Sequence, residues 1–205
     1  MAKLKTAYFC QNCGSQYPQW TGQCKNCGEW NTLVEEVVEK TASHKTPPFS
    51  KTKQHVINII EVEAIEEPRI KTPSDELNRV LGGGIVLGSV TLIGGEPGIG
   101  KSTLLLQLAL KMKKKIFYVS GEESASQIKM RADRLADVKN PNCFLYTETS
   151  LEKILHEAKK LEPDFVIIDS IQTLQSQLIE SSPGTVSQIR ECSNEIIKYA
   201  KENNV

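Results

Sequence analysis

Residues 95–102 follow the pattern G-x-x-x-x-G-K-[ST], which is typical of a phosphate-binding P-loop. In such a loop, backbone N–H groups surround the β- and γ-phosphates of a nucleotide, the lysine reaches the same phosphates and the hydroxyl binds Mg²⁺. The pattern assigns the phosphate contact to Lys101, with a catalytic role, and the Mg²⁺ contact to Ser102. The full set of residues expected at the nucleotide is Gly95, Glu96, Pro97, Gly98, Ile99, Gly100, Lys101, Ser102 and Thr103.

The segments on either side of this loop favour a nucleotide site over a chance match in a glycine-rich turn. Residues 89–93 predict a buried strand that enters the loop, and residues 103–110 predict a helix that leaves it. The positive N-terminus of that helix would lie at the phosphates.

Four cysteines form a second chemical pattern, C-x2-C-x10-C-x2-C, made by Cys10, Cys13, Cys24 and Cys27. Four thiolates at this spacing predict a closed, tetrahedral, structural zinc site. Two disulfides or four free thiols are the alternatives, and a reducing compartment favours the metal. So short a unit buries little core, so Zn²⁺ would supply its folding free energy. We expect Tyr17, Trp20 and Trp30 to pack there, with base stacking as the alternative.

Carboxylates follow two of the predicted strands. Asp169 ends the apolar stretch 165–169, and the carboxyl end of a strand is where α/β sheets bind their ligands. It is therefore expected to support Mg²⁺ beside Ser102. Glu122 and Glu123 follow the strand 116–120, where a glutamate could activate the water that attacks the γ-phosphate. The residues alone equally allow a pair that complements a helix dipole.

Strands and helices alternate along the rest of the chain. Strands are predicted at 116–120, 143–146 and 165–169, and helices at 75–81, 125–135 and 151–161 and from 186 onward. The last two helices each follow a possible capping box, Thr149 with Glu152 and Thr185 with Gln188. This alternation predicts an α/β fold with a parallel sheet covered on both faces. The expected inner face of the last helix contains Val186, Ile189, Ser193, Ile196, Ile197 and Ala200.

Composition divides the chain into three parts: a zinc finger at 7–34, a polar linker at 35–55 and a P-loop core at 56–205. A βα unit normally returns to the sheet after its helix, so we expect this core to be incomplete at its C-terminal end. The 25 basic and 25 acidic residues balance, so any DNA-binding surface has to be local. The sequence has neither a signal peptide nor an apolar run of transmembrane length, and we expect a cytoplasmic protein.

Zinc knuckles followed by a RecA-type P-loop core resemble the RadA (Sms) family of bacterial DNA repair proteins. The resemblance extends over nearly the whole chain outside the linker. The segments that carry it are 10–14, 20–24, 81–86, 94–104, 118–124, 168–173 and 182–192. Leu87 and the pair Pro73-Ser74 depart from the family's usual residues. The family's next strand, its Lys-Asn-Arg-Phe-Gly motif and its Lon-protease-like domain are not found in this sequence.

The resemblance implies a hexameric, DnaB-like motor that uses ATP with Mg²⁺ to move on single-stranded and branched DNA. It implies branch migration of recombination intermediates and RecA recombinase as a partner. By position the resemblance implies that Glu122 is the catalytic glutamate, with Glu123 as second choice. It also implies that residues 174–188 face DNA. Two other readings stay open: a KaiC-like ATPase or autokinase that acts on protein, and a non-enzymatic zinc- and nucleotide-binding adaptor.

Overall fold

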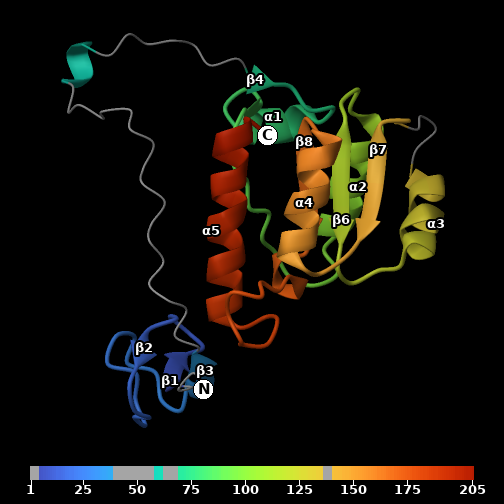
Figure 1. Cartoon of the computed structure of the whole chain (residues 1–205). Coiled ribbons are helices and arrows are strands. Elements are labelled where there is room, and N and C mark those ends of the chain that lie inside the picture. Colours follow the sequence, from blue (N-terminus) through green and yellow to red (C-terminus); the bar gives the residue numbers. More distant parts are fainter. Residues whose placement is uncertain (1–4, 39–57, 62–68, 136–139) are drawn as a thin grey trace.

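The computed structural model describes residues 5–38, 58–61, 69–135 and 140–205 (Figure 1). Residues 5–38 form a small antiparallel sheet in the order β2-β1-β3. Its strands are β1 (Lys5–Cys10), β2 (Gln16–Tyr17) and β3 (Leu33–Val38). Residues 35–38, expected in the linker, therefore extend β3, while residues 39–55 of that linker lie outside the described part.

The larger unit contains a parallel sheet in the order β7-β6-β8. Its strands are β6 (Ile116–Ser120), β7 (Cys143–Thr147) and β8 (Phe165–Asp169), as the sequence predicted. Five helices accompany it: α1 (Asp75–Val80), α2 (Lys101–Lys111), α3 (Ala125–Leu135), α4 (Leu151–Leu161) and α5 (Val186–Asn203). The short strands β4 (Arg69–Ile70) and β5 (Ile85–Val86) pair with each other, and 3-10 turns cover Ile59–Glu61 and Ile171–Thr173.

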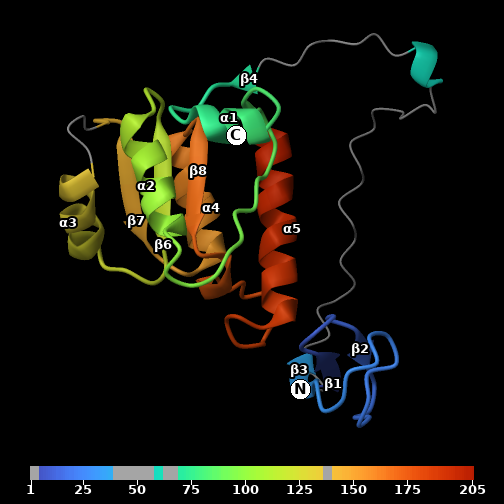
Figure 2. The ribbon, with the colours of Figure 1, turned by 180° about the vertical axis from the view of Figure 1, so that it is seen from behind.

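Helices cover both faces of this sheet, as Figures 1 and 2 show. Alternate residues of β6 point to opposite faces, since side chains alternate along a strand. Ile116 and Tyr118 pack with α2 and α3, whereas Phe117 and Val119 pack with α4 and α5. β6 is the central strand of the described sheet, and all five of its residues are buried. The predicted α/β P-loop fold with a small four-cysteine unit is thus confirmed.

The predicted strand at residues 89–93 is wrong. Residues 89–96 belong to no helix or strand, and the side chain of Leu92 is 82% exposed. An isolated strand is not stable in water, because its backbone groups need a neighbouring strand as hydrogen-bonding partner. Within the described residues, β8 pairs with β6 alone, so no strand lies beside 89–93.

The two predicted capping boxes have different outcomes. Thr185 is the N-cap of α5, and its side chain accepts a hydrogen bond from the Gln188 N–H, as predicted. The Thr149–Glu152 box is wrong, because Ser150 takes the N-cap position of α4 and donates to Glu152 instead. The nearby Glu148 carboxylate accepts the N–H groups of Thr149 and Ser150, and it therefore satisfies donors that the box would have used.

Candidate nucleotide and metal sites

The P-loop joins the unpaired segment 89–94 to α2, near the end of the sheet where β6, β7 and β8 finish (Figures 1 and 2). Gly98 and Gly100 have φ values of +79° and +102°, a backbone region that favours glycine. A Cβ built at either position would meet nothing within 4 Å, so the space over the loop is open. The Lys101 ammonium donates to the carbonyl oxygens of Gly95 at 2.7 Å and Glu96 at 2.8 Å. The lysine therefore lies over the predicted phosphate cradle.

The start of α2 is suited to an anion. Its N-cap is Gly100, which has no side chain to accept the free N–H groups of the first turn. Ser102 and Thr103 lie in this first turn. The eleven-residue helix adds the positive end of its dipole, so a phosphate group there would receive both hydrogen bonds and favourable electrostatics.

Asp169 ends β8 and is held by a residue that the sequence analysis did not select. The Tyr118 hydroxyl donates to Asp169 Oδ2 at 3.0 Å, and the Tyr118 side chain is buried. Burial, reinforced by the Asp169 charge, raises the pKa of Tyr118 above its usual value, so the hydroxyl stays protonated and remains a donor. The only sign of this role in the sequence was the polar hydroxyl of Tyr118 inside the apolar stretch 116–120. In the structure, Tyr118 pairs with Ile167, which lies two residues before Asp169.

Glu122 and Asp169 are brought to the same end of the sheet. The N–H of Gly121 donates to the Asp169 carbonyl oxygen at 3.2 Å, and the Ser170 hydroxyl donates to Glu122 Oε1 at 2.8 Å. The residues that follow β6 and β8 are therefore joined, so Glu122 and Asp169 lie at the same end of the sheet. This is the arrangement that a site with one metal-supporting and one water-activating carboxylate needs.

Glu123 has a different environment from Glu122. Its Oε1 accepts from the Arg131 guanidinium at 2.7 Å, and the Arg131 side chain is only 18% exposed. Glu123 Oε2 is buried without a hydrogen-bond partner among the described residues. The Arg131 guanidinium therefore engages the Glu123 carboxylate, whereas the Ser170 hydroxyl engages that of Glu122.

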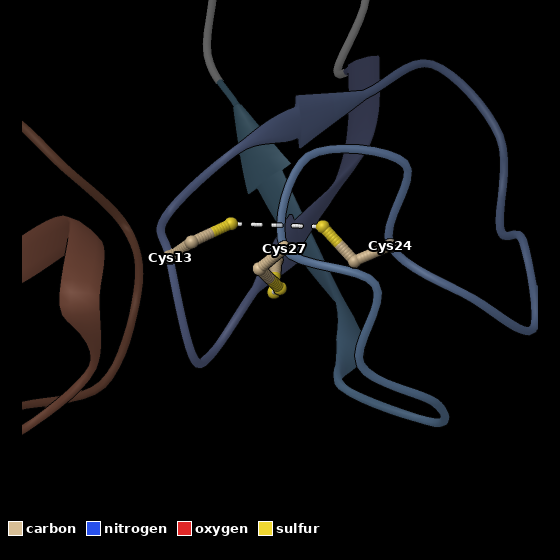
Figure 3. A group of neighbouring side chains, drawn as sticks. Cys13, Cys24 and Cys27 are labelled. Carbon is tan, nitrogen blue, oxygen red and sulfur yellow. Dashed lines mark hydrogen bonds between the residues drawn. The ribbon is translucent and has the colours of Figure 1, made fainter.

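The four cysteines of the small unit form a compact cluster. Their Sγ atoms all lie within 4.8 Å of one another. Figure 3 shows the Sγ atoms of Cys13 and Cys24, which are 3.6 Å apart, as are those of Cys10 and Cys27. A tetrahedral zinc ion with Zn–S bonds of about 2.3 Å separates its sulfurs by about 3.8 Å, whereas a disulfide brings them to about 2 Å. The spacing fits a metal with four thiolate ligands.

Neighbouring donors favour the thiolate form of Cys13 and Cys24, whereas, against the hydrogen bonds from Glu29 and Asn12, burial and the side chains of Cys24 and Cys10 raise the pKa of Cys27 to about 11. Hydrogen bonds from the side chains of Asn26 and Ser15 lower the pKa of Cys13 to about 5. The Tyr17 hydroxyl, 3.3 Å from Cys24 Sγ, lowers the pKa of Cys24. Trp20 and Trp30, in contrast, do not pack the small core as predicted. They are 54% and 66% exposed, and a Cβ built at Gly22 would lie 3.6 Å from the Trp30 ring and 3.8 Å from the Trp20 ring.

Residues 174–188, which the resemblance to the family implies face DNA, are anchored by one buried amide. The Gln188 side chain is 1% exposed, and its Nε2 donates to the carbonyl oxygens of Ser176, Ile179 and Ser181. Its Oε1 accepts the N–H of Ser176. Four hydrogen bonds from one side chain therefore fix residues 176–181 against the start of α5.

Models of known protein families match the two units described above. A model described as an AAA domain matches residues 58–198, more than half of the chain. The chain belongs to the AAA domain family. A second model, described as a rubredoxin metal binding domain, matches residues 8–35, which contain the four-cysteine cluster.

Curated relatives give a more specific likeness. The chain is 47% identical over 211 residues to the DNA repair protein RadA of Bacillus subtilis, covering 100% of this chain and 46% of that protein. It is 50% identical over 216 residues to the DNA repair protein RadA of Rickettsia felis, with the same coverage. The predicted resemblance to the RadA family is confirmed. The chain spans about half the length of these relatives. No helix among the described residues is long and apolar enough to cross a membrane.

Proposed function

We propose that this chain is the nucleotide-binding part of an ATP-driven motor that acts on DNA in repair and recombination. The observation that carries the proposal is the hydrogen bond from the Ser170 hydroxyl to Glu122, which joins the residue after Asp169 to the residues after β6 at the sheet end next to the P-loop. The names of the relatives, DNA repair protein RadA, supply the biological setting.

The proposed roles follow from the positions of the side chains. Backbone N–H groups of residues 95–103 and the Lys101 ammonium bind the phosphates of ATP. The Ser102 hydroxyl and the Asp169 carboxylate hold Mg²⁺, directly or through water. Glu122 accepts a proton from the attacking water as the bond between the γ-phosphorus and the bridging oxygen breaks, so that ADP leaves and inorganic phosphate forms.

Single-stranded and branched DNA is the proposed polymer, with branch migration as the outcome and RecA recombinase and further copies of the chain, up to a hexameric ring, as partners. Two features of the structure support contact with DNA. Trp20 and Trp30 offer exposed aromatic faces on which bases stack. The segment 174–188 directly follows β8 and its 3-10 turn. A shift in the position of Asp169 would therefore be transmitted to this segment through only a few residues.

Lys101→Ala tests the nucleotide site. The substitution removes the ammonium from the phosphates, so we expect ATP affinity to fall at least tenfold, measured with a fluorescent ATP analogue, and ATP hydrolysis to be lost. Zinc content, measured by atomic emission, should stay the same. Lys111→Ala is the matched control, because Lys111 lies at the opposite end of the same helix and is exposed. Hydrolysis at the wild-type rate in Lys101→Ala would overturn the assignment.

Addition of single-stranded DNA to the same assay separates the candidate functions. A DNA motor hydrolyses ATP faster when DNA is present. A KaiC-like enzyme that acts on protein hydrolyses ATP at a rate that DNA does not change, and an adaptor binds ATP without turnover. The last two results would each contradict the proposal.

A further inference from the structure

The side chain of Glu122 is exposed and is held by the turn that follows β8. Its Oε1 accepts a hydrogen bond from the Ser170 hydroxyl at 2.8 Å. A long, exposed carboxylate samples several rotamers unless a neighbour fixes it, and a general base acts only within hydrogen-bonding reach of its water. The position of Ser170 therefore decides where the candidate base lies.

Thr173 closes this turn on Ser170. The N–H of Thr173 donates to the Ser170 carbonyl oxygen at 3.2 Å, and the Thr173 hydroxyl donates to the same oxygen at 2.8 Å. One carbonyl oxygen, with its two lone pairs, thus receives both donors of a single residue. Threonine is branched at Cβ, which restricts the rotation of the hydroxyl. Without that hydroxyl, the Ser170 carbonyl would keep only the longer of the two hydrogen bonds.

The same Thr173 side chain lies against the backbone that precedes Glu122. A Cβ built at Gly121 would be 2.6 Å from Thr173 Cβ, which is closer than such atoms approach in folded proteins, and it would also collide with the Thr173 hydroxyl. Gly121 does not have a positive φ, so glycine is needed here for close approach and not for backbone conformation. Thr173 therefore contacts both Ser170 and the residue before Glu122.

The other end of the turn is anchored to the start of α4. The N–H of Gln175 donates to the Thr149 carbonyl oxygen at 2.9 Å. The side chain of Ser176 is buried, and its hydroxyl donates to Glu152 Oε1 at 2.8 Å. Thr173 is thus held between the end of the sheet and α4.

We propose that Thr173 is a positioning residue for Glu122. Its hydroxyl fixes the Ser170 carbonyl, and its contact with Gly121 keeps the backbone before Glu122 beside the turn. The Ser170 hydroxyl and the Glu122 carboxylate then stay in one relative arrangement during hydrolysis. The role of Glu122 rests on the proposed function, whereas the attachment of the turn to Gly121 does not.

Thr173→Val tests the hydroxyl. Valine keeps the branched shape but cannot donate, so the Ser170 carbonyl loses its 2.8 Å hydrogen bond. We expect kcat for ATP hydrolysis, measured by phosphate release, to fall at least tenfold, because a small displacement of a reacting group is costly. The affinity for a fluorescent ATP analogue should stay within twofold. Thr173→Ser keeps the hydroxyl and should remain within threefold of the wild-type kcat.

Thr149→Val is the matched control for packing. The Thr149 methyl lies 3.1 Å from the Cβ position of Gly121, and valine keeps that methyl. We therefore expect a kcat within threefold of wild type. Equal losses in the two valine variants would assign the effect to packing and overturn the proposal. A wild-type kcat in Thr173→Val, an equal loss in Thr173→Ser, or a fall in ATP affinity that matches the fall in kcat would overturn it as well.

Amide exchange measures the attachment of the turn without any turnover of ATP. The Gly121 N–H donates to the carbonyl oxygen of Asp169, which is next to Ser170. In Thr173→Val, we expect the Gly121 amide, followed by NMR, to exchange at least fivefold faster, while the amide of Val119 inside β6 is unchanged. Unchanged exchange at Gly121 would contradict the positioning role.

The positioning role and the proposed function fail in different ways. A wild-type chain that does not hydrolyse ATP contradicts the proposed function, and exchange at Gly121 then still decides whether Thr173 holds the turn. Full hydrolysis in Glu122→Gln together with slow hydrolysis in Thr173→Val means that Thr173 acts on a different group, and this result overturns its assignment to Glu122.

Discussion

Two adjacent glutamates at the end of β6 differ in what they contact, although the sequence treats them alike. Glu122 meets the Ser170 hydroxyl next to Asp169, and Glu123 meets the Arg131 guanidinium. Of the two, Glu123 is held in a partly buried ion pair. The two residues should therefore respond differently to the same substitution.

Glu122→Gln is expected to lower the rate of ATP hydrolysis at least a hundredfold while ATP still binds, because general-base catalysis contributes about 10²–10⁴-fold. Glu123→Gln is the matched control at the next position. It should leave the rate within about threefold of wild type but lower the free energy of unfolding by about 1–3 kcal/mol, since Arg131 loses its charged partner. Rates come from phosphate release and stabilities from urea unfolding. The reverse pattern would make Glu123 the base.

The start of α4 shows how an element depends on a residue just outside it. Glu148 accepts hydrogen bonds from the N–H groups of Thr149 and Ser150 and from Lys153 Nζ at 2.8 Å. The Lys153 ammonium, together with these N–H groups, lowers the pKa of Glu148 to about 2, from an ordinary value of 4.5. The charged carboxylate thus stabilises the folded state above pH 4.5, and this contribution is lost as the pH falls toward 2.

Glu148→Ala should therefore lower the free energy of unfolding by about 1 kcal/mol at pH 7, the usual effect of losing a helix cap. The difference from wild type should shrink steadily between pH 4.5 and pH 3, because the wild-type carboxylate becomes protonated in the unfolded chain first. Urea unfolding at several pH values measures both effects. Glu157→Ala, which removes an exposed partner of Lys160, should lower the free energy of unfolding by less than Glu148→Ala does. A difference that stays constant with pH would exclude the role given to the Glu148 charge.

Local patterns predicted the helices and three of the strands because the information lies within each segment. The periodicity of residues 125–135 and 151–161 and the apolar runs 116–120 and 165–169 led directly to α3, α4, β6 and β8. Residues 89–93 have the same apolar, β-branched character and still form no strand. A strand needs a partner that is distant in sequence, and no property of the segment itself shows whether that partner is present.

The same limit applies to the site. The P-loop, the four cysteines and Asp169 were predicted from residue types and spacing, because the residues that define each of these patterns lie close together in the chain. The resemblance to the family already favoured Glu122 over Glu123. The hydrogen bonds from Tyr118 to Asp169 and from Ser170 to Glu122, in contrast, depend on which strands are neighbours. Those contacts join β6 to β8, which are separated in the chain by two helices and β7, so they were not accessible from the sequence.

At the scale of the whole molecule, two units have separate cores. Cys10, Cys24 and Leu33 form the buried cluster of the small unit, and no residue of that cluster belongs to the two clusters of the α/β unit. Arg190 of α5 donates to the Cys13 carbonyl oxygen at 3.3 Å, a contact between the units. One hydrogen bond near the surface contributes about 1 kcal/mol, which is too little to make one unit depend on the other for folding.

Removal of zinc should consequently unfold residues 5–38 and leave the α/β unit folded. With a strong zinc chelator, or in Cys24→Ser, we expect amide protection in β1 and β3 to disappear while protection in β6 and α4 changes by less than threefold. Cys143→Ser is the control, because Cys143 is a half-buried thiol of β7 outside the cluster. Amide hydrogen exchange with and without the chelator measures the protection of each element. Loss of protection in β6 would show that the two units fold as one.

Among the described residues one edge of β8 has no paired strand, and this edge also has a consequence for the behaviour of the chain in solution. An apolar strand edge that accepts one strand does not distinguish between chains, so it can template association between molecules. The 25 positive and 25 negative residues cancel, and the long-range repulsion that keeps many proteins dispersed is correspondingly weak. Concentrated preparations should therefore turn turbid near neutral pH and clear when the pH is moved so that the molecules acquire a common charge.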